Sequence, residues 1–439
     1  MEKREFARRR KRLMDIAGHG GIVIQPTAPE RIRNRDVYYP FRPDSDFYYL
    51  TGFPEPEAVL VLVPDRPQGE CILFCRERDD EAESWHGRRA GLEGACELYG
   101  ADDAFPITDL DDILPGLIEN KERIYFTMGR YADFDQRLVS WLNRVTSKGR
   151  AGIHAPDQFV SLGHVVHEMR LFKSSQELKA MRRAASIAAA AHRRAMAACK
   201  SGMREYQIEA ELLHSFMQQG ARSPAYPSIV GGGANSCILH YTENSDVLKD
   251  GDLLLIDAGA EYDSYASDIT RTFPVSGEYT TEQRQIYEIV LEAQLAAIAE
   301  VRPGNTWNEP HEAAIEVITR GLIDIGILKG RLRKLIDEEA YKPYYPHKTG
   351  HWLGMDVHDV GDYKLHDEWR VFEPGMVTTV EPGLYLAATL KDLGKQWWNI
   401  GVRIEDDVLV TETGHEILTI EAPKSVEAVE AAMRERSAA

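Results

Sequence analysis

Residues 253–274 of the chain read LLLIDAGAEYDSYASDITRTFP, and this stretch is the strongest indication of the fold. An apolar run leads into Asp257, a polar, glycine-containing segment follows, and Asp268 is expected on the return strand of a hairpin. Because side chains alternate across a strand, Leu253, Leu255 and Asp257 point to the same face. An aspartate that ends a buried face needs a partner, since otherwise its desolvation is costly. For either aspartate alone, the simple alternative is a turn residue that caps its loop.

A second block, PHKTGHWLGMDVHD at residues 346–359, brings together His347, His351 and His358. Two histidines four residues apart are a common zinc motif when they lie on a helix. The proline and glycines of this block favour a loop, so a helical zinc site is disfavoured. A loop has few packing reasons to carry three histidines, and we therefore predict that they have a functional role.

Two further strands carry acidic residues. In VTTVEPGLY, residues 377–385, Glu381 ends an apolar run directly before Pro-Gly. In GVRIEDDVLV, residues 401–410, Glu405 is expected in the middle of a strand. Alternation places Arg403 and Glu405 on one face of that strand, where a surface ion pair is the simple alternative.

Together these blocks supply four carboxylates and one imidazole, which make an oxygen-rich ligand set. Such a set favours a pair of ions such as Mn²⁺, Co²⁺, Fe²⁺ or Zn²⁺ over a single structural Zn²⁺, which prefers thiolates and imidazoles. The carboxylate charges balance two divalent ions, and burial of so many carboxylates without metal charge would be strongly unfavourable. We therefore predict a two-metal centre built from Asp257, Asp268, His351, Glu381 and Glu405.

Length and composition indicate a globular protein of two domains. The 439 residues exceed one ordinary core, and 43% hydrophobic with 28% charged residues is typical of a folded chain. The formal net charge of -18 argues against a nucleic-acid or anionic-membrane partner, because both need a basic face. No apolar run approaches the roughly 18 residues that a membrane-spanning helix needs. The five scattered cysteines argue against a disulfide framework and predict a reducing, cytoplasmic setting.

The first 173 residues alternate strand-like and helical stretches, which predicts an α/β domain. Strands are expected at residues 21–24, 58–63 and 123–126, where short apolar runs lie between glycines and prolines. The basic run Arg8–Arg12 is expected on a surface helix with a solvated basic face, because no apolar segment of a targeting peptide follows it.

The second domain, residues 174–439, is predicted to be α+β, with helices packed on an antiparallel sheet. Three capping boxes are expected to open helices, because a Ser or Thr side chain and a Glu or Gln three residues later satisfy each other's backbone donors. These boxes are Ser174 with Glu177, Thr280 with Gln283, and Thr306 with Glu309.

The quoted blocks resemble, in order and approximate spacing, the aminopeptidase P branch of the pita-bread metallopeptidases. Its relatives include prolidase, methionine aminopeptidase and the metal-free creatinase. The resemblance covers residues 220–410, including ILHYTEN at 238–244, and the stretches 38–62 and 165–177 are similar to the N-terminal domain and linker of the branch. It implies an aminopeptidase P-type α/β domain in residues 1–173 and a pita-bread (creatinase/aminopeptidase-like) catalytic domain in residues 174–439.

The resemblance also implies a role for each matched residue. Asp257 would chelate one metal ion, His351 and Glu381 the other, and Asp268 and Glu405 would bridge the two ions, which in this family are usually manganese. Glu381, or the bridging carboxylates Asp268 and Glu405, would take the proton of the attacking water. The accessory residues would be His240 at the substrate near the scissile bond, His347 and His358 at the substrate carbonyl or in proton transfer, Arg403 orienting the ligands, Tyr385 lining the cleft, and Asp36 and Trp85 at the substrate across a subunit contact.

The activity implied is the release of the N-terminal residue from peptides with proline in the second position, by attack of a metal-bridged hydroxide. The expected partners are such peptides and further copies of the chain in a homodimer or homotetramer. The alternatives are a prolidase restricted to Xaa-Pro dipeptides, a metal-free creatinase-like hydrolase, and a catalytically silent peptide-binding homologue. The creatinase-like alternative would lack most of the carboxylate ligands. The sequence departs from the family pattern at Lys348 and near Arg370. These departures are expected to affect which peptides the site accepts.

Overall fold

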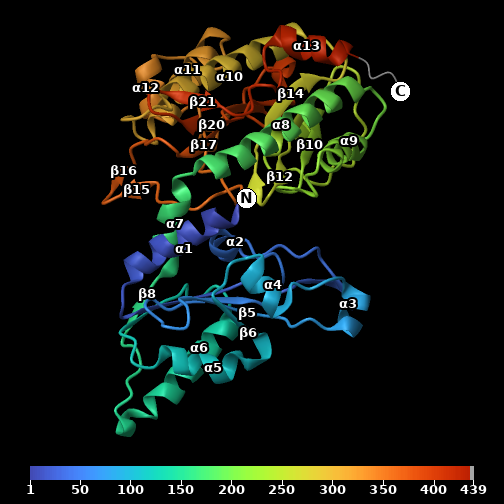
Figure 1. The fold of residues 1–439 in the computed structure, drawn as a ribbon. Coiled ribbons are helices and arrows are strands. Elements are labelled where there is room, and N and C mark those ends of the chain that lie inside the picture. Colours follow the sequence, from blue (N-terminus) through green and yellow to red (C-terminus); the bar gives the residue numbers. More distant parts are fainter. Residues whose placement is uncertain (436–439) are drawn as a thin grey trace. The chain divides into compact units, whose positions relative to one another are not determined.

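A computed structural model describes residues 1–435, and the chain divides into two compact units. The first unit is Met1–Arg170 and the second is Leu171–Ala439, so the expected domain boundary between residues 173 and 174 lies just inside the second unit. Helix α7 (Leu162–Leu171) leads from one unit into the other (Figure 1). Among residues 1–435, no helix is both long and apolar enough to cross a membrane.

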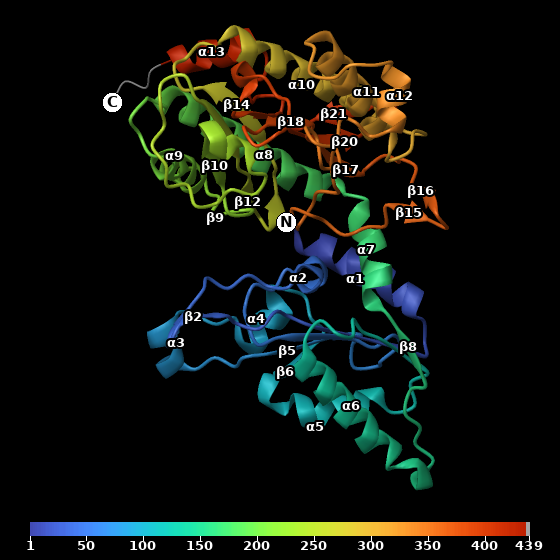
Figure 2. The same ribbon diagram turned by 180° about the vertical axis from the view of Figure 1, so that it is seen from behind.

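The first unit is built on a mixed six-stranded sheet with the order β6-β5-β4-β1-β7-β8. Helices α1, α2 and α4 cover one face of the sheet and α5 and α6 cover the other (Figures 1 and 2), which explains why strands β1, β4 and β5 are buried throughout. The strands predicted at residues 21–24, 58–63 and 123–126 are confirmed as β1, β4 and β7. These three strands are neighbours in the sheet, in the order β4-β1-β7. The elements are α1 (Lys3–Ala17), β1 (Gly21–Pro26), β2 (Ile32–Asn34), β3 (Val37–Tyr38), α2 (Ser45–Thr51), β4 (Val59–Leu62), β5 (Cys71–Cys75), α3 (Asp80–His86), α4 (Gly91–Glu97), β6 (Asp103–Pro106), α5 (Leu110–Ile118), β7 (Arg123–Tyr125), α6 (Ala132–Thr146) and β8 (Gln158–Val160).

The basic run lies on helix α1 as expected, but its basic face is solvated only in part, because Arg8, Lys11 and Arg12 are exposed whereas Arg9 and Arg10 are buried. Arg9 and Arg10 are only 2% and 4% exposed. Arg9 donates to the carbonyl of Tyr49 and Arg10 to that of Leu50, both at 2.9 Å. These carbonyls lie in the last turn of α2, where backbone oxygens have no partner within the helix. The two guanidinium groups therefore cap α2 instead of facing water.

The second unit is α+β, as predicted, and all its strand pairs are antiparallel. Helices α8 and α9 pack on each other and on β10, β12 and β13, whereas α10 packs on α11 and on β17, β18 and β19 (Figures 1 and 2). The elements are α8 (Ser175–Ala198), α9 (Glu205–Gln218), β9 (Ser223–Pro224), β10 (Ile229–Gly232), β11 (Leu253–Asp257), β12 (Ala260–Tyr262), β13 (Tyr265–Ala266), β14 (Thr270–Pro274), α10 (Thr281–Glu300), α11 (Glu309–Asp324), α12 (Leu332–Asp337), β15 (Lys364–Leu365), β16 (Glu368–Trp369), β17 (Val377–Val380), β18 (Gly383–Leu386), β19 (Ile400–Arg403), β20 (Asp406–Val410), β21 (His415–Ile417) and α13 (Val426–Arg434).

Two of the three predicted capping boxes are confirmed, at the start of α8 and at the start of α10. The third was wrong, because α11 begins at Glu309 and its N-cap is Asn308. The Glu309 carboxylate does accept from the backbone N–H of Thr306 at 2.8 Å. However, the Thr306 backbone forms a bridge with Val371, which keeps it extended and delays the start of the helix.

Candidate metal centre

A cavity of about 400 Å³ in the second unit is lined by all five predicted metal ligands. These residues come from segments that are far apart in the sequence, so only the folded chain assembles them. The ligands on the wall are Asp257, Asp268, His351, Glu381 and Glu405, and the other predicted site residues on it are His240, His347, His358 and Arg403.

Asp257 and Asp268 are brought together by a break in the predicted hairpin. Strand β11 pairs directly with β14, with Asp257 opposite Thr270. Asp268 therefore lies just before β14 and not on the return strand, so that part of the prediction was wrong. The residues between the two aspartates form the separate hairpin β12–β13, which pairs with β9, and this turns the chain back toward Asp257.

Glu405 also lies between strands and not in the middle of one. Strand β19 pairs with β18 and β20 pairs with β17, so the chain changes partner at Glu405. The Glu405 N–H donates to the carbonyl of Thr270 at 3.1 Å, which joins this crossing point to β14. Glu405 and Arg403 are 1% and 3% exposed, so the alternative of a surface ion pair is wrong.

His351 and Glu381 are neighbours because the histidine loop runs along strand β17. The Thr379 N–H donates to the His351 carbonyl at 2.9 Å, and the Glu381 N–H donates to the Thr349 carbonyl at 2.7 Å. A Cβ at Gly350 would lie 2.1 Å from the Thr379 carbonyl oxygen, so only glycine permits this close approach. Residues 346–359 contain no helix, which confirms the predicted loop.

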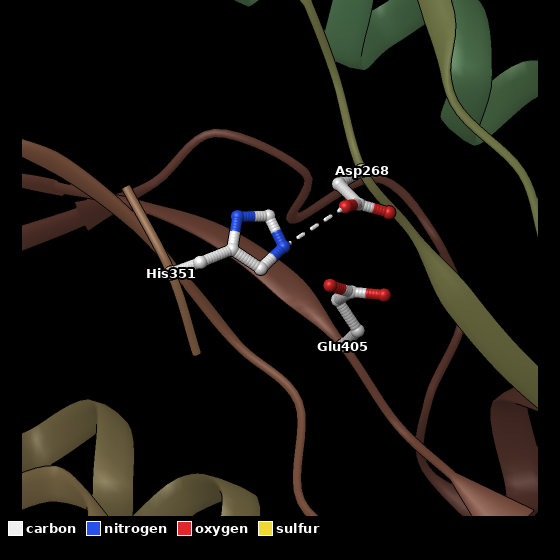
Figure 3. A group of neighbouring side chains, drawn as sticks. All are labelled: Asp268, His351 and Glu405. Carbon is white, nitrogen blue, oxygen red and sulfur yellow. Dashed lines mark ion pairs between the residues drawn. The ribbon is translucent and has the colours of Figure 1, made fainter. Parts of the chain in front are cut away.

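The side chains of Asp268, His351 and Glu405 converge, and one ligand atom from each lies within 4.8 Å of the others (Figure 3). His351 Nε2 is 3.4 Å from Asp268 Oδ2 and 3.7 Å from Glu381 Oε1. The other ring nitrogen, Nδ1, donates to the Trp352 carbonyl at 3.0 Å. This hydrogen bond leaves Nε2 directed toward the carboxylates, the arrangement that a metal-binding histidine needs.

The charge of the site fits divalent cations. Burial, together with neighbouring carboxylates, raises the pKa of Asp268 and Glu405 and brings that of Glu381 to about 7. Although burial acts in the opposite direction, the hydrogen bond to Asp268 and the charge of Glu381 raise the pKa of His351 to about 9. The cavity wall carries four carboxylates against three basic groups, Lys348, His351 and Arg403, of which His351 and Arg403 contact the acids. Metal ions would therefore supply charge that the chain lacks here.

Arg403 organises one side of the cluster. Its guanidinium donates to Asp257 Oδ2 at 2.7 Å, to the Tyr385 hydroxyl at 3.0 Å and to Thr270 Oγ1 at 3.1 Å. The Thr270 hydroxyl donates in turn to Glu405 Oε2 at 2.6 Å. One buried cation thus orients Asp257 directly and Glu405 through Thr270.

His347 is held as a neutral imidazole behind Tyr385. Burial and the charge of Arg403 lower the pKa of His347 to about 4. Its Nδ1 lies 2.7 Å from the Lys348 carbonyl, which can only accept, so Nδ1 carries the proton. The Tyr385 hydroxyl therefore donates to His347 Nε2 at 2.8 Å. Both ring nitrogens of His347 therefore have protein partners, although the residue also lines the cavity.

Two residues of this site were not found from the sequence. The Tyr226 hydroxyl donates to Asp257 Oδ1 at 2.6 Å and also contacts Asp268. Nothing in the pattern around Tyr226 points to this role. Thr270 lies opposite Asp257 in the pairing of β11 with β14, a register that the structure shows and the predicted hairpin did not contain.

Four further residues that were singled out in the sequence lie in different parts of the structure. Lys348 lines the cavity, whereas Arg370 is 5% exposed and its guanidinium lies 5.6 Å from the Phe172 ring centre. Asp36 is an exposed turn residue between β2 and β3 in the first unit. Trp85 lies on α3 of the same unit and is 78% exposed.

Metal binding to the metal-free chain is expected to release protons at neutral pH. With pKa values of about 7 for Glu381 and about 9 for His351, both groups hold protons that a metal ion must displace. Metal affinity should therefore strengthen as the pH rises through these values and weaken as it falls. Calorimetric titration with Mn²⁺ in buffers of different ionisation enthalpy measures the released protons. Identical heats in all buffers would contradict the expectation.

Comparison with known proteins assigns the chain to a class. Residues 179–412 match the family model for metallopeptidase family M24, and residues 6–125 match that for the aminopeptidase P N-terminal domain. The chain belongs to metallopeptidase family M24, with an aminopeptidase P N-terminal domain preceding the catalytic domain. The resemblance and the fold class inferred from the sequence are confirmed.

Particular relatives match the chain over nearly its full length. It is 46% identical to the Xaa-Pro aminopeptidase of Escherichia coli (strain K12) over 434 residues, which cover 99% of this chain and 98% of that protein. The structure of Pseudomonas aeruginosa aminopeptidase PepP is 56% identical, with a TM-score of 0.99 and coverage of 100% of this chain and 99% of that one. Zn-substituted E. coli aminopeptidase P in complex with product matches at 45% identity and a TM-score of 0.97, with both chains covered completely.

Proposed function

We propose that this chain is a metal-dependent aminopeptidase that releases the N-terminal residue from peptides with proline in the second position. The observation that carries the proposal is the convergence of Asp268, His351 and Glu405, with Asp257 and Glu381 on the same cavity wall. The full-length similarity to Xaa-Pro aminopeptidases supplies the proline preference, which the ligand set alone does not determine.

The proposed centre holds two divalent ions, and we propose manganese. Asp257 would hold one ion, His351 and Glu381 would hold the other, and Asp268 and Glu405 would be shared by both. The placement of Asp268 and Glu405 within reach of His351, with Asp257 joined to Asp268 through Tyr226, supports this division. When bound, such a pair supplies a water of lowered pKa and a Lewis acid for the scissile carbonyl.

The residues of the chain account for substrate orientation and proton transfer. The free amino terminus of a peptide is attracted to the carboxylates of the cavity, which explains why the first residue is removed. Glu381 takes the proton of the attacking water. The nitrogen of proline has no N–H and leaves only when it receives a proton, so a donor must face it. His240 and His358 line the cavity and are the donors that we propose.

A peptide series tests this function. Metal-loaded protein should cleave an Xaa-Pro-Xaa tripeptide and leave the matched Xaa-Ala-Xaa tripeptide largely intact, and removal of metal by a chelator should stop cleavage. Activity confined to Xaa-Pro dipeptides would instead identify a prolidase. Cleavage that continues at full rate after metal analysis shows no bound metal would refute the proposal.

We also propose that the chain assembles into a homo-oligomer. The hairpin β2–β3 and the residue after it present Ile32, Val37, Tyr38 and Tyr39, which are between 49% and 59% exposed. Exposed apolar residues grouped on one hairpin are typical of a contact with a partner, and a second copy of the chain is the partner that we propose. Asp36 lies at the turn of this hairpin, and we propose that Asp36 and Trp85 act at such a contact.

The state of the cysteines supports a reducing compartment. All five cysteines are free thiols, and Cys71, Cys75 and Cys199 are buried. Burial raises the pKa of the Cys71 thiol to about 11 and that of the Cys75 thiol to about 12, which keeps both unreactive. We propose the cytoplasm as the location of the protein.

A further inference from the structure

A buried carboxylate that does not line the cavity accepts hydrogen bonds from the loop that carries His240. Glu205 is the first residue of helix α9 and is completely buried. Residues 233–246 contain a short 3-10 helix, η3 (Gly233–Cys237), followed by the loop with His240. Glu205 is not part of the metal centre, and nothing in the proposed chemistry explains why a charge is buried there.

The Glu205 carboxylate accepts a hydrogen bond from each of four uncharged donors. Oε1 accepts from the Gly232 N–H at 2.8 Å and from Asn235 Nδ2 at 3.0 Å. Oε2 accepts from the Tyr241 hydroxyl at 2.7 Å and from the Asp246 N–H at 2.8 Å. Gly232 directly precedes the segment 233–246, Asn235 lies near its start, Tyr241 lies within it and Asp246 is its last residue. One carboxylate therefore connects the whole loop to α9.

The position of His240 depends on that of Tyr241, the next residue in the chain. The Tyr241 side chain is 7% exposed and packs with Ile229, Leu255 and Tyr385. Its neighbours on either side in the sequence, His240 and Thr242, both line the cavity. The His240 side chain is itself exposed, so its direction depends on the backbone that Tyr241 anchors.

A second, uncharged anchor holds the same loop. Asn244 is 2% exposed, accepts from the Val230 N–H at 3.0 Å and donates to the Ser228 carbonyl at 2.9 Å. Loss of the Glu205 contacts should therefore shift the loop while the Asn244 contacts remain. This makes an effect on His240 separable from unfolding.

We propose that Glu205 is a positioning residue of the reaction, which holds His240 at the substrate through the Tyr241 hydroxyl. The inference rests on the proposed function. In Glu205→Gln, an NH₂ group replaces one of the two carboxylate oxygens. Two of the four groups that donate to Glu205 would then face this NH₂ group and have no acceptor. The loop should then relax, and His240 should leave its productive position.

A double-mutant cycle tests this inference on the full, manganese-loaded chain. Glu205→Gln should lower kcat/KM for an Xaa-Pro-Xaa tripeptide by about tenfold or more, since small displacements of reacting groups have effects of this size. In a His240→Ala background, the same substitution should lower kcat/KM less than about twofold, because residues that act through one another are not additive. Bound metal per chain should not change.

Two further variants keep the test interpretable. Tyr241→Phe removes the link to His240 without adding a buried donor, so it should show a smaller loss that also disappears in the His240→Ala background, and it carries the test if Glu205→Gln does not fold. Glu209→Gln is the matched control on the same helix, because its single bond from Asn244 Nδ2, at 3.0 Å, can be kept by the glutamine oxygen. It should match wild type.

The outcomes separate this inference from the proposed function. Equal losses from Glu205→Gln and Tyr241→Phe with and without His240 would show a purely structural role and overturn the inference alone. Loss of bound metal in Glu205→Gln would also overturn it. A wild-type chain that does not cleave the tripeptide overturns the proposed function, and this inference with it.

Discussion

Asp268→Ala should remove tight binding of one of the two metal ions and lower kcat/KM for an Xaa-Pro-Xaa tripeptide by about 10³-fold or more. Asp268 is 5% exposed, and its carboxylate contacts both His351 and Tyr226. One oxygen of its carboxylate contacts His351, and the other contacts Tyr226, whose hydroxyl also bonds to Asp257. Its loss should therefore affect both halves of the site.

Metal analysis of the purified variant, combined with steady-state kinetics, measures this effect. Asp250→Ala is a suitable control, because Asp250 is an exposed aspartate of the same unit that does not line the cavity. It should retain full metal content and activity. An Asp268→Ala protein with normal turnover and two ions per chain would exclude the proposed centre.

His358→Ala should lower kcat by about 10²- to 10³-fold and leave the metal content unchanged, which is the range expected for loss of a proton-transfer group. The His358 imidazole lines the cavity, and its ring centre is 4.4 Å from that of His351. Burial and the nearby charges of His351 and His240 lower the pKa of His358. It is therefore neutral at pH 7 and can accept and return a proton.

The pH profile of kcat distinguishes proton transfer from a packing effect. The acidic limb of the wild-type profile should change in His358→Ala, whereas His366→Ala, a substitution of an exposed histidine outside the cavity, should leave rate and profile unaltered. A His358→Ala protein that loses metal would place His358 among the ligands and contradict its proposed role.

The sequence was sufficient to identify the metal-ligand candidates but not their setting. Asp257 and Glu381 were correctly expected at the ends of apolar strands. Asp268 and Glu405 were expected on strands and lie between them, because alternation along one segment cannot show where a chain changes its hydrogen-bonding partner. Each of these two residues lies at such a change.

Local sequence patterns also failed to predict the burial of some charged residues. Arg9 and Arg10 were expected in water, since a run of basic residues on a helix usually faces solvent. Their partners are carbonyls of α2 and, for Arg10, of Gly100, which no pattern in residues 3–17 indicates. The buried carboxylate of Glu205 escaped notice for the same reason, because its donors lie 27 to 41 positions away.

By itself, the sequence determined the residue types of the site, the α/β and α+β character of the two halves and the family. These properties depend on strand periodicity, capping residues and motif spacing, all of which are local along the chain. Only the tertiary structure decided that Tyr226 joins Asp257 to Asp268, that Arg403 reaches Asp257 and Tyr385, and that Glu205 holds the His240 loop. Such contacts depend on which distant segments share a buried space, where an unpaired polar group is costly, and that cost acts only once the chain has folded.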